Sequence, residues 1–171
     1  IYILRLFLKI FNNNVYKYIV QTDSMSRLVK KNLSNNVIKL PFLSDIYSKK
    51  AKEVNFNNKL YDFIYVASGY SYKNHLNLLD AWQLLADENL YPSLLLTIDS
   101  KRFPKILNII NQKIRKSDLK VENIYFDNHD NLVEMYSKSR ALIFPSNCES
   151  FGIPLIEAKY FNLPVLAGEL D

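Results

Sequence analysis

Glycine and cysteine are the residues that this sequence has least of. Three glycines in 171 residues leave few sites for left-handed turns, so each one marks a loop of interest, and Gly69 and Gly152 fall in two candidate loops. The one cysteine, Cys148, excludes an intrachain disulfide and favours a reducing compartment, so we expect a cytoplasmic location. The Cys, His and Asp residues show no metal-ligand spacing, and His75 and His129 are interpreted as surface or loop residues.

Apolar runs long enough to span a bilayer are also missing. The apolar stretch Ile1–Phe11 is too short to cross a membrane, and no small-residue cleavage site of a signal peptide follows it. Two interpretations of this stretch stay open: an interfacial helix at the inner face of the cytoplasmic membrane, or a helix buried in a domain. Because the chain lacks an initiator Met and begins within a helical pattern, we expect it to be a fragment.

Acidic side chains are fewer than basic ones, which gives the chain a net charge of +5 and a pI near 9.1. Such a charge suits an anionic partner: nucleic acid, a membrane surface or a phosphate-bearing substrate. The basic residues are scattered and no motif interleaves them with aromatics, so we do not expect nucleic acid as a partner. A hydrophobic fraction of 49% and a charged fraction of 23% argue against a disordered chain.

Short apolar runs alternate with helical patterns along most of the chain. The strand candidates are residues 18–22, 37–40, 63–67, 94–98, 121–126, 140–144 and 164–167. The helix candidates are residues 1–11, 24–32, 76–86, 106–114, 132–137 and 154–161. Runs that are apolar throughout are typical of parallel strands covered on both faces. The sequence therefore predicts an α/β fold, a Rossmann-like parallel sheet with helices on both faces, and the polar residues 45–59 are interpreted as a linker.

Two loops of the predicted sheet carry chemistry suited to a ligand, because ligands of open parallel sheets bind beyond the carboxyl ends of the strands. The first loop, residues 68–75, places Lys73 at the entry of a helix, where its ammonium can neutralise a phosphate. The alternative is a solvated lysine in a loop where Asn74 caps the helix. The second loop, residues 145–157, joins a buried strand to a helix.

The second loop is expected to form an anion site. Pro154 suits the first helical position, so the amides of Phe151, Gly152 and Ile153 would lie at the positive end of the helix. Gly152 would allow a ligand to approach the backbone closely.

Two carboxylates flank this anion site. Glu157, in the first turn of the helix, has two oxygens that can accept hydrogen bonds from both hydroxyls of a ribose. Glu149 precedes the anion site and would face a sugar hydroxyl. Taken singly, each has an ordinary structural explanation, as a partner of the helix dipole or as an exposed loop residue. Their spacing around residues 151–154 is what indicates a ligand site.

The segment Glu149–Ala158, ESFGIPLIEA, resembles the signature of the large retaining glycosyltransferase family with the two-domain GT-B fold, the family 4 or group 1 type. That signature has two glutamates separated by seven residues, with Phe-Gly and Pro between them. The flanking Pro145-Ser146 and the LPVLA sequence of residues 163–167 also fit it. The resemblance extends over nearly all of the chain.

The resemblance also implies a division into domains. Residues 1–44 would be the end of the N-terminal, acceptor-side domain with the crossing between domains. Residues 60–171 would be a nucleotide-sugar-binding domain that is incomplete at its C-terminal end.

Carried over residue by residue, the resemblance implies a donor site with Glu149 and Lys73 as catalytic residues. Lys73 would contact the donor diphosphate, Glu149 the transferred sugar, and Glu157 the ribose. The donor site would be completed by Ser68, Gly69, Asn74, Ser150, Phe151, Gly152 and Ile153.

The implied reaction is transfer of a sugar from a UDP- or GDP-sugar to a saccharide or lipid-linked acceptor, with retention, as in bacterial surface polysaccharide synthesis. The resemblance implies no cofactor and no obligate metal, because Lys73 and the helix end would stabilise the departing diphosphate. The alternative is a nucleotide-binding module that is inactive in transfer as an isolated fragment.

Two positions depart from the family pattern. Many members have Gly-Arg shortly before the lysine, where this chain has Ala67-Ser68, so one phosphate cation is absent. The loop after Phe126 is short and has Asn128 where a glycine is usual.

Overall fold

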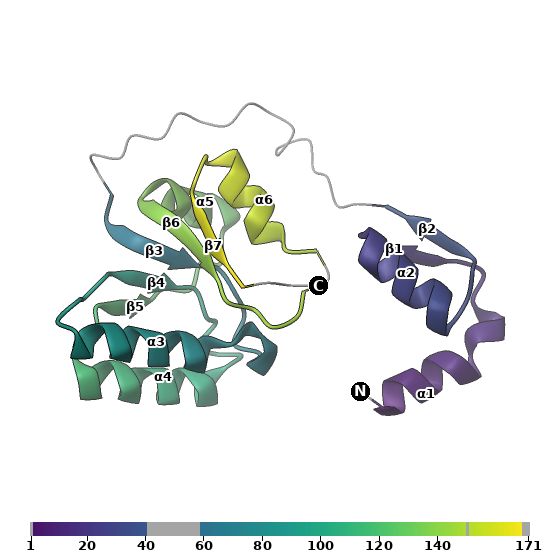
Figure 1. Cartoon of the computed structure of the whole chain (residues 1–171), viewed down its shortest axis with the longest axis horizontal. Coiled ribbons are helices and arrows are strands. Elements are labelled where there is room, and N and C mark those ends of the chain that lie inside the picture. Colours follow the sequence, from purple (N-terminus) through teal and green to yellow (C-terminus); the bar gives the residue numbers. More distant parts are fainter. Residues whose placement is uncertain (1, 41–58, 150, 169–171) are drawn as a thin grey trace. The chain divides into compact units, whose positions relative to one another are not determined.

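The computed structural model describes residues 2–40, 59–149 and 151–168 (Figure 1). The chain divides into two compact units, one within residues 1–48 and one within residues 49–170. Most of the predicted linker 45–59 lies outside the described residues, so the domain boundaries stay a prediction.

The first unit is a small βαβ arrangement that follows a helix. Its elements are α1 (Tyr2–Ile10), the 3₁₀ turn η1 (Asn12–Asn14), β1 (Tyr18–Val20), α2 (Asp23–Asn32) and β2 (Val37–Lys39). Strands β1 and β2 pair in parallel, with Ile19 opposite Ile38. Thr22 begins α2 as a cap, because its Oγ1 accepts a hydrogen bond of 3.2 Å from the Met25 amide.

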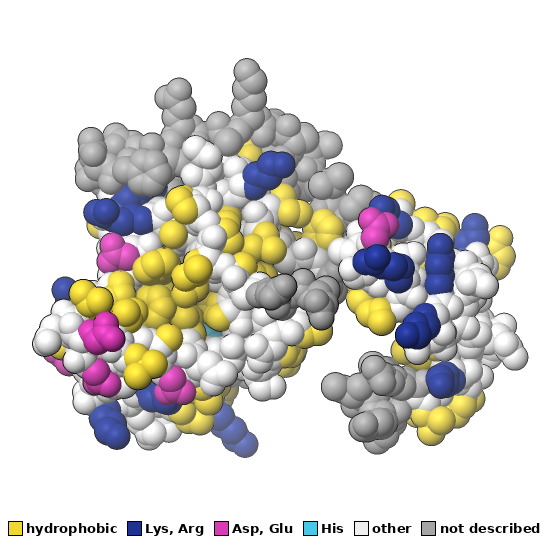
Figure 2. All heavy atoms as spheres, in the orientation of Figure 1, with side chains coloured by type: hydrophobic (Ala, Val, Ile, Leu, Met, Phe, Trp, Pro, Cys, Tyr) yellow, Lys and Arg dark blue, Asp and Glu magenta, His cyan; other side chains and the backbone are white. Residues whose placement is uncertain are grey.

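The first unit carries the excess positive charge of the chain. Residues 1–40 contain seven Lys and Arg against one acid, Asp23, whereas residues 59–171 contain twelve against fourteen. Figure 2 shows the basic side chains spread over the first unit, together with the exposed apolar side chains of α1. No helix in the described part of the chain is long and apolar enough to cross a membrane.

The second unit is built on a five-stranded parallel sheet with the order β5-β4-β3-β6-β7. Its strands are β3 (Tyr61–Tyr65), β4 (Leu94–Leu96), β5 (Val121–Asn123), β6 (Ser139–Phe144) and β7 (Val165–Ala167). Its helices are η4 (Ser71–Lys73, a 3₁₀ turn), α3 (His75–Asp87), α4 (Pro104–Ser117), α5 (His129–Ser137) and α6 (Ile153–Tyr160). Helices α3 and α4 lie side by side on one face of the sheet, and α5 and α6 cover the other (Figure 1). The predicted Rossmann-like fold class is therefore confirmed.

The central strands are buried from both sides, which explains why their sequences are apolar throughout rather than alternating. Residues Leu94–Leu96 of β4 are completely buried, as are Ile64 and Tyr65 of β3. Trp82 of α3 packs edge-on against Phe63 at 5.5 Å between ring centres, and its indole N–H donates to the Pro92 carbonyl at 2.9 Å. The core is thus sealed without leaving the indole donor unpaired.

Strands β4 and β5 are shorter than the apolar runs that predict them. After β4 the Ile98 amide donates to the Asn123 side-chain oxygen at 2.8 Å, and the Asn123 amide group returns a bond of 3.0 Å to the Ile98 carbonyl. The Asn123 side chain thus takes the place of a backbone hydrogen-bond pair of the sheet, and the loops begin there, at the carboxyl edge.

Helix α6 begins at Ile153, so the predicted placement of Glu157 in its first turn is wrong; Glu157 lies in the second turn.

The order in which successive strands are added to the parallel sheet reverses between β3 and β6. Strands β4 and β5 extend the sheet on one side of β3, and β6 and β7 extend it on the other. Loops that leave two such neighbouring strands diverge to opposite faces and create a crevice at the carboxyl edge. The two loops predicted to carry ligand chemistry are the ones that follow β3 and β6.

Candidate functional site

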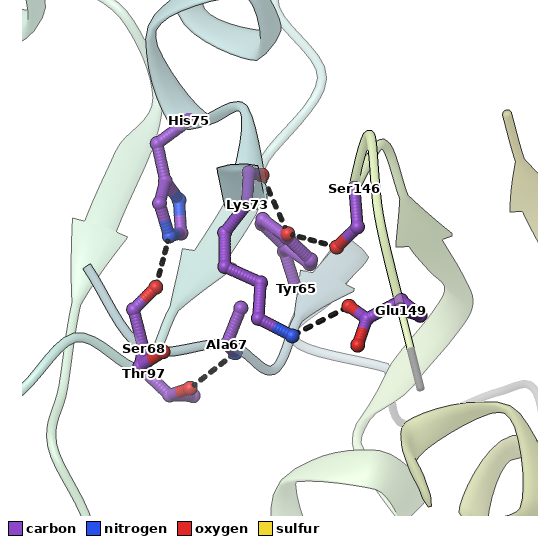
Figure 3. A network of polar contacts seen from close by, with 8 residues as sticks. All are labelled: Tyr65, Ala67, Ser68, Lys73, His75, Thr97, Ser146 and Glu149. Carbon is purple, nitrogen blue, oxygen red and sulfur yellow. Dashed lines mark hydrogen bonds and ion pairs between the residues drawn. The ribbon is translucent and has the colours of Figure 1, made fainter. Parts of the chain in front are cut away.

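Lys73 and Glu149 meet at the carboxyl ends of β3 and β6, where the strand order reverses. The Lys73 Nζ lies 2.5 Å from Glu149 Oε1, and the two side chains are 15% and 14% exposed. Figure 3 shows the ammonium and the carboxylate reaching toward one another from the loops after β3 and β6. Each charge is largely removed from water, so each depends on a close opposite charge. The structure thus brings together the two residues that the sequence predicts to be catalytic.

Tyr65 connects the same two loops from below. Its phenol donates a hydrogen bond of 2.6 Å to the Lys73 carbonyl and shares one of 2.9 Å with the Ser146 hydroxyl (Figure 3). Burial raises the pKa of the Tyr65 phenol well above its usual value, so the group stays protonated and can donate. Tyr65 is the last residue of β3, and the rigid sheet thereby holds both loops.

The backbone of the two loops is joined by two further hydrogen bonds. Asn74 Nδ2 donates to the Pro145 carbonyl at 3.1 Å, and the Asn147 amide donates to the Tyr72 carbonyl at 2.8 Å. Asn74 takes the left-handed conformation with φ 61° and begins α3, but its side chain does not cap the helix. Asn74 is thus the N-cap residue of α3, as expected, but its side chain bonds to the loop after β6 instead of to the helix.

His75 is buried at the start of α3, so its interpretation as a surface or loop residue is wrong. Its Nε2 lies 2.9 Å from the Ser68 carbonyl, which can only accept, so Nε2 carries the proton and Nδ1 does not. Nδ1 has no hydrogen-bond partner among the described residues. Burial lowers the pKa of His75 and the nearby Lys73 charge lowers it further, while the bond to Ser68 opposes both. The neutral ring therefore holds the loop that carries Lys73.

The N-terminus of α6 has the conformation that the sequence predicts for an anion site. Gly152 precedes the helix with φ 75°, and a Cβ there would lie 3.0 Å from the Leu155 side chain. The positive φ favours glycine at this position, and any side chain there would also press against Leu155. Ile153 and Pro154 begin the helix, and the first amides of a helix have no partner within it. Ser150 lies outside the described residues, and anion binding here stays a prediction.

Glu157 of α6 is buried, with 4% of its surface exposed. One of its oxygens accepts a hydrogen bond of 2.5 Å from the Tyr136 phenol, and the other lies 3.2 Å from His129 Nε2. His129 is at the start of α5, and its side chain is half exposed. The second histidine is therefore a neighbour of Glu157, which its position in the sequence does not reveal.

A cavity of about 260 Å³ opens between the loops that follow β3, β4 and β5. Its lining residues are Val66, Ala67, Ser68, Thr97, Asp99, Arg102, Phe103, Tyr125, Phe126 and Leu132. Gly69 makes this arrangement possible, because a Cβ there would lie 2.7 Å from the Phe103 side chain. Of the residues predicted to bind the donor, Ser68 lines the cavity and Gly69 supports its wall.

The loop after β4 was missed by reasoning from the sequence. It follows a third parallel strand, so the rule that pointed to the other two loops applies to it equally. It contributes Asp99 and Arg102 to the cavity. Tyr65 and Tyr136 could not have been found, because each is one tyrosine among twelve and no local pattern marks its contact with Ser146 or Glu157. In the described part of the chain, no three His, Cys, Asp or Glu side chains gather as a metal site would require.

Residues 46–170 match the family model described as glycosyl transferases group 1, so the chain belongs to that family. The capsular polysaccharide biosynthesis glycosyltransferase CapH of Staphylococcus aureus is 27% identical over 92% of this chain and 46% of its own length. The serotype-specific mannosyltransferase WbdA of Escherichia coli is 56% identical over 39 residues, which are 23% of this chain and 5% of WbdA. The chain thus spans half or less of these relatives.

Solved structures confirm the GT-B type of fold. HepE of Anabaena, solved in complex with UDP and glucose, superposes with a TM-score of 0.74 over 98% of this chain and 48% of HepE, at 16% identity. A glycosyltransferase of Rickettsia africae superposes with the same TM-score at 19% identity, over 96% of this chain and 48% of that protein.

Removing the Tyr65 hydroxyl tests the connection between the loops. We expect Tyr65→Phe to lower the free energy of unfolding by about 1–3 kcal/mol, because the partly buried Lys73 carbonyl and the buried Ser146 hydroxyl lose their partner. Chemical denaturation measures the change. Tyr91→Phe is the matched control, since this exposed phenol lies far along the chain in the loop before β4. Equal stability of the two variants would show that Tyr65 does not hold the loops.

The buried His75 predicts a pH dependence of stability. Because the folded state lowers the pKa of His75, the unfolded chain takes up the proton first as the pH falls below about 6.5. The free energy of unfolding should therefore decrease between pH 7.5 and pH 5.5, and more so in the wild type than in His75→Gln. Denaturation curves at three pH values measure this difference. The same series in His129→Gln separates the two histidines, and parallel curves for wild type and His75→Gln would contradict the assignment.

Proposed function

We propose that the complete protein transfers a sugar from a nucleoside-diphosphate sugar to a saccharide or lipid-linked acceptor, with retention at the anomeric carbon. The observation that carries this proposal is the ion pair between Lys73 and Glu149 at the carboxyl ends of β3 and β6, where the strand order reverses. The membership of the chain in the group 1 glycosyl transferases supports it. Because CapH and WbdA are named for polysaccharide biosynthesis and mannosyl transfer, we place the reaction in the synthesis of a bacterial surface polysaccharide.

The Lys73–Glu149 ion pair is a resting arrangement that a donor could exchange. A diphosphate arriving at the crevice would compete with Glu149 for the Lys73 ammonium, and the released carboxylate would then accept hydrogen bonds from the hydroxyls of the transferred sugar. The first amides of α6 would add donors to the phosphate. The same two residues thus serve the free and the donor-bound states without leaving a buried charge unpaired.

The chemical step breaks the bond between the anomeric carbon and the phosphate oxygen and forms a bond to the acceptor oxygen. The acceptor proton passes to an oxygen of the departing diphosphate on the same face, which accounts for retention. Lys73 and the α6 amides stabilise the charge that develops on the leaving group. We propose that these groups make a divalent ion dispensable, so transfer should persist in the presence of a chelator.

The identity of the donor base is proposed from the relatives. HepE is solved in complex with UDP and glucose, which favours a UDP-sugar, whereas the mannosyltransferase name of WbdA favours a GDP-sugar. The second candidate function, nucleotide binding without transfer, applies to the chain as printed, because it spans 46% of CapH. We propose a cytoplasmic location for the donor site, and the inner membrane face for the acceptor if that acceptor is lipid-linked.

Calorimetric titration with UDP and GDP, followed by a donor screen with the full-length protein, tests the proposal. We expect one of the two nucleotides to bind, and the matching sugar donors to release it when acceptor is present. The readout is free UDP or GDP. A folded sample that binds neither nucleotide would remove both the transferase and the binding-module interpretations.

The two glutamates should affect different steps. We expect Glu157→Ala to weaken nucleotide binding, by about tenfold or more, because a carboxylate holding two ribose hydroxyls contributes charge-assisted hydrogen bonds. Glu149→Ala should lower turnover more than donor affinity, since its partner is the sugar. Isothermal titration and initial rates measure the two effects.

Tyr136→Phe is the control for the structural part of the Glu157 effect. It removes the same buried hydrogen bond but leaves the carboxylate in place, so its nucleotide affinity should stay within about threefold of wild type. Unchanged affinity in Glu157→Ala, or an equal loss in Tyr136→Phe, would contradict the ribose-binding role.

A further inference from the structure

Arg102 is the one cation among the residues that line the cavity at the carboxyl edge. The cavity is otherwise bounded by neutral side chains and Asp99, and after β3 it has Ala67 and Ser68, where the family resemblance implies that one phosphate cation is absent. Arg102 comes from a different loop, after β4.

The overall charge of the second unit gives an anionic ligand no general attraction, so individually placed cations matter. Residues 59–171 contain twelve basic and fourteen acidic side chains, so this part of the chain does not attract anions as a whole. The Lys73 charge is already offset by Glu149 at 2.5 Å. A nucleoside diphosphate carries more than one negative charge, so a second cation beside Lys73 and the α6 amides would improve the match.

The backbone of Arg102 is fixed by a tight turn. Asp99 Oδ1 accepts from the amides of Lys101 at 2.8 Å and Arg102 at 3.2 Å, and the Asp99 carbonyl accepts from the Phe103 amide at 2.9 Å. Such an Asx turn holds the loop without help from a ligand. The Phe103 ring packs against Gly69, so the turn lies directly on the loop that leads to Lys73.

The guanidinium of Arg102 is oriented by aromatic groups rather than by an acid. Its Nη2 donates to the Tyr70 hydroxyl at 2.8 Å, and its Cζ lies 5.6 Å and 5.4 Å from the ring centres of Tyr70 and Phe103. None of the ion pairs in the described part of the chain involves Arg102. A guanidinium has five N–H donors, so a preoriented cation with donors to spare faces the cavity.

Tyr70 and Tyr72 connect this cation to Lys73. Their rings stack with centres 5.6 Å apart and an angle of 9° between planes. Arg102 lies over the Tyr70 ring, and the Lys73 Nζ lies 5.3 Å from the centre of the Tyr72 ring. The two cations are therefore held by one aromatic pair on a single loop.

We propose that Arg102 is the second cation of the donor diphosphate site and supplies, from the loop after β4, the charge that Ser68 does not. This inference rests on the proposed function. Arg102 binds phosphate oxygens through its planar N–H groups, and Tyr70 is a positioning residue that aims it. Lys73 and Arg102 together then match the charge of the diphosphate.

The test compares a nucleotide with its nucleoside. Calorimetry compares the wild type with Arg102→Gln in binding the nucleoside diphosphate, UDP or GDP, that the wild type prefers. Ligand-observed NMR compares the same two proteins in binding the corresponding nucleoside. We expect about tenfold to a hundredfold weaker binding of the diphosphate, and a change of about twofold or less for the nucleoside. Arg102→Lys should recover part of the lost affinity, because lysine keeps the positive charge but lacks the planar pair of N–H donors of the guanidinium.

Lys105→Gln is the matched control, since it removes the same charge from an exposed position of α4; its affinity should stay within about twofold of wild type. Arg102 is exposed, so thermal unfolding of Arg102→Gln should match wild type, and Tyr70→Phe provides a second variant that disturbs only the orientation. Equal losses for nucleotide and nucleoside would assign Arg102 to the base and overturn the inference, as would unchanged diphosphate affinity. A wild type that binds neither UDP nor GDP overturns the proposed function itself, and this inference with it.

Discussion

The ion pair between Lys73 and Glu149 is the interaction on which the rest of the site depends. Two charges that are mostly removed from water must face each other, so the loops after β3 and β6 are constrained to meet. The Tyr65 hydroxyl and the Asn74 and Asn147 hydrogen bonds hold those loops to the sheet and to each other. In the function proposed here, a ligand replaces one member of the pair, which makes binding an exchange between anions rather than the filling of an empty charge site.

The order of the strands explains why this exchange site lies where it does. Helices α3 and α4 occupy one face of the sheet and α5 and α6 the other, and the loops after β3 and β6 come together at the carboxyl edge, where ligands of open parallel sheets bind. The loop after β4 reaches the same edge and brings Arg102. Positive charge for the donor thus comes from individually placed side chains, whereas the excess charge of the chain belongs to residues 1–40.

The fold could be predicted from the sequence because apolar runs such as Leu94–Leu96 occur where a strand is buried on both faces. Lys73, Glu149 and Gly152 could be predicted because a motif with fixed spacing marks them. The surroundings of Glu157 could not, since Tyr136 and His129 reach it from another helix and no local pattern encodes that contact. Arg102 could not be predicted because its loop carries no motif, and its place beside the donor loop depends on the packing of Phe103 on Gly69 and on its own contact with Tyr70.

A structure of the protein bound to the nucleoside diphosphate that it prefers would show whether the ligand replaces Glu149. We expect the Lys73 ammonium to leave Glu149 and to lie within hydrogen-bond distance of a phosphate oxygen, with Glu149 turned toward the position of the sugar. A nucleotide bound elsewhere, with the Lys73–Glu149 ion pair still intact at 2.5 Å, would contradict this expectation.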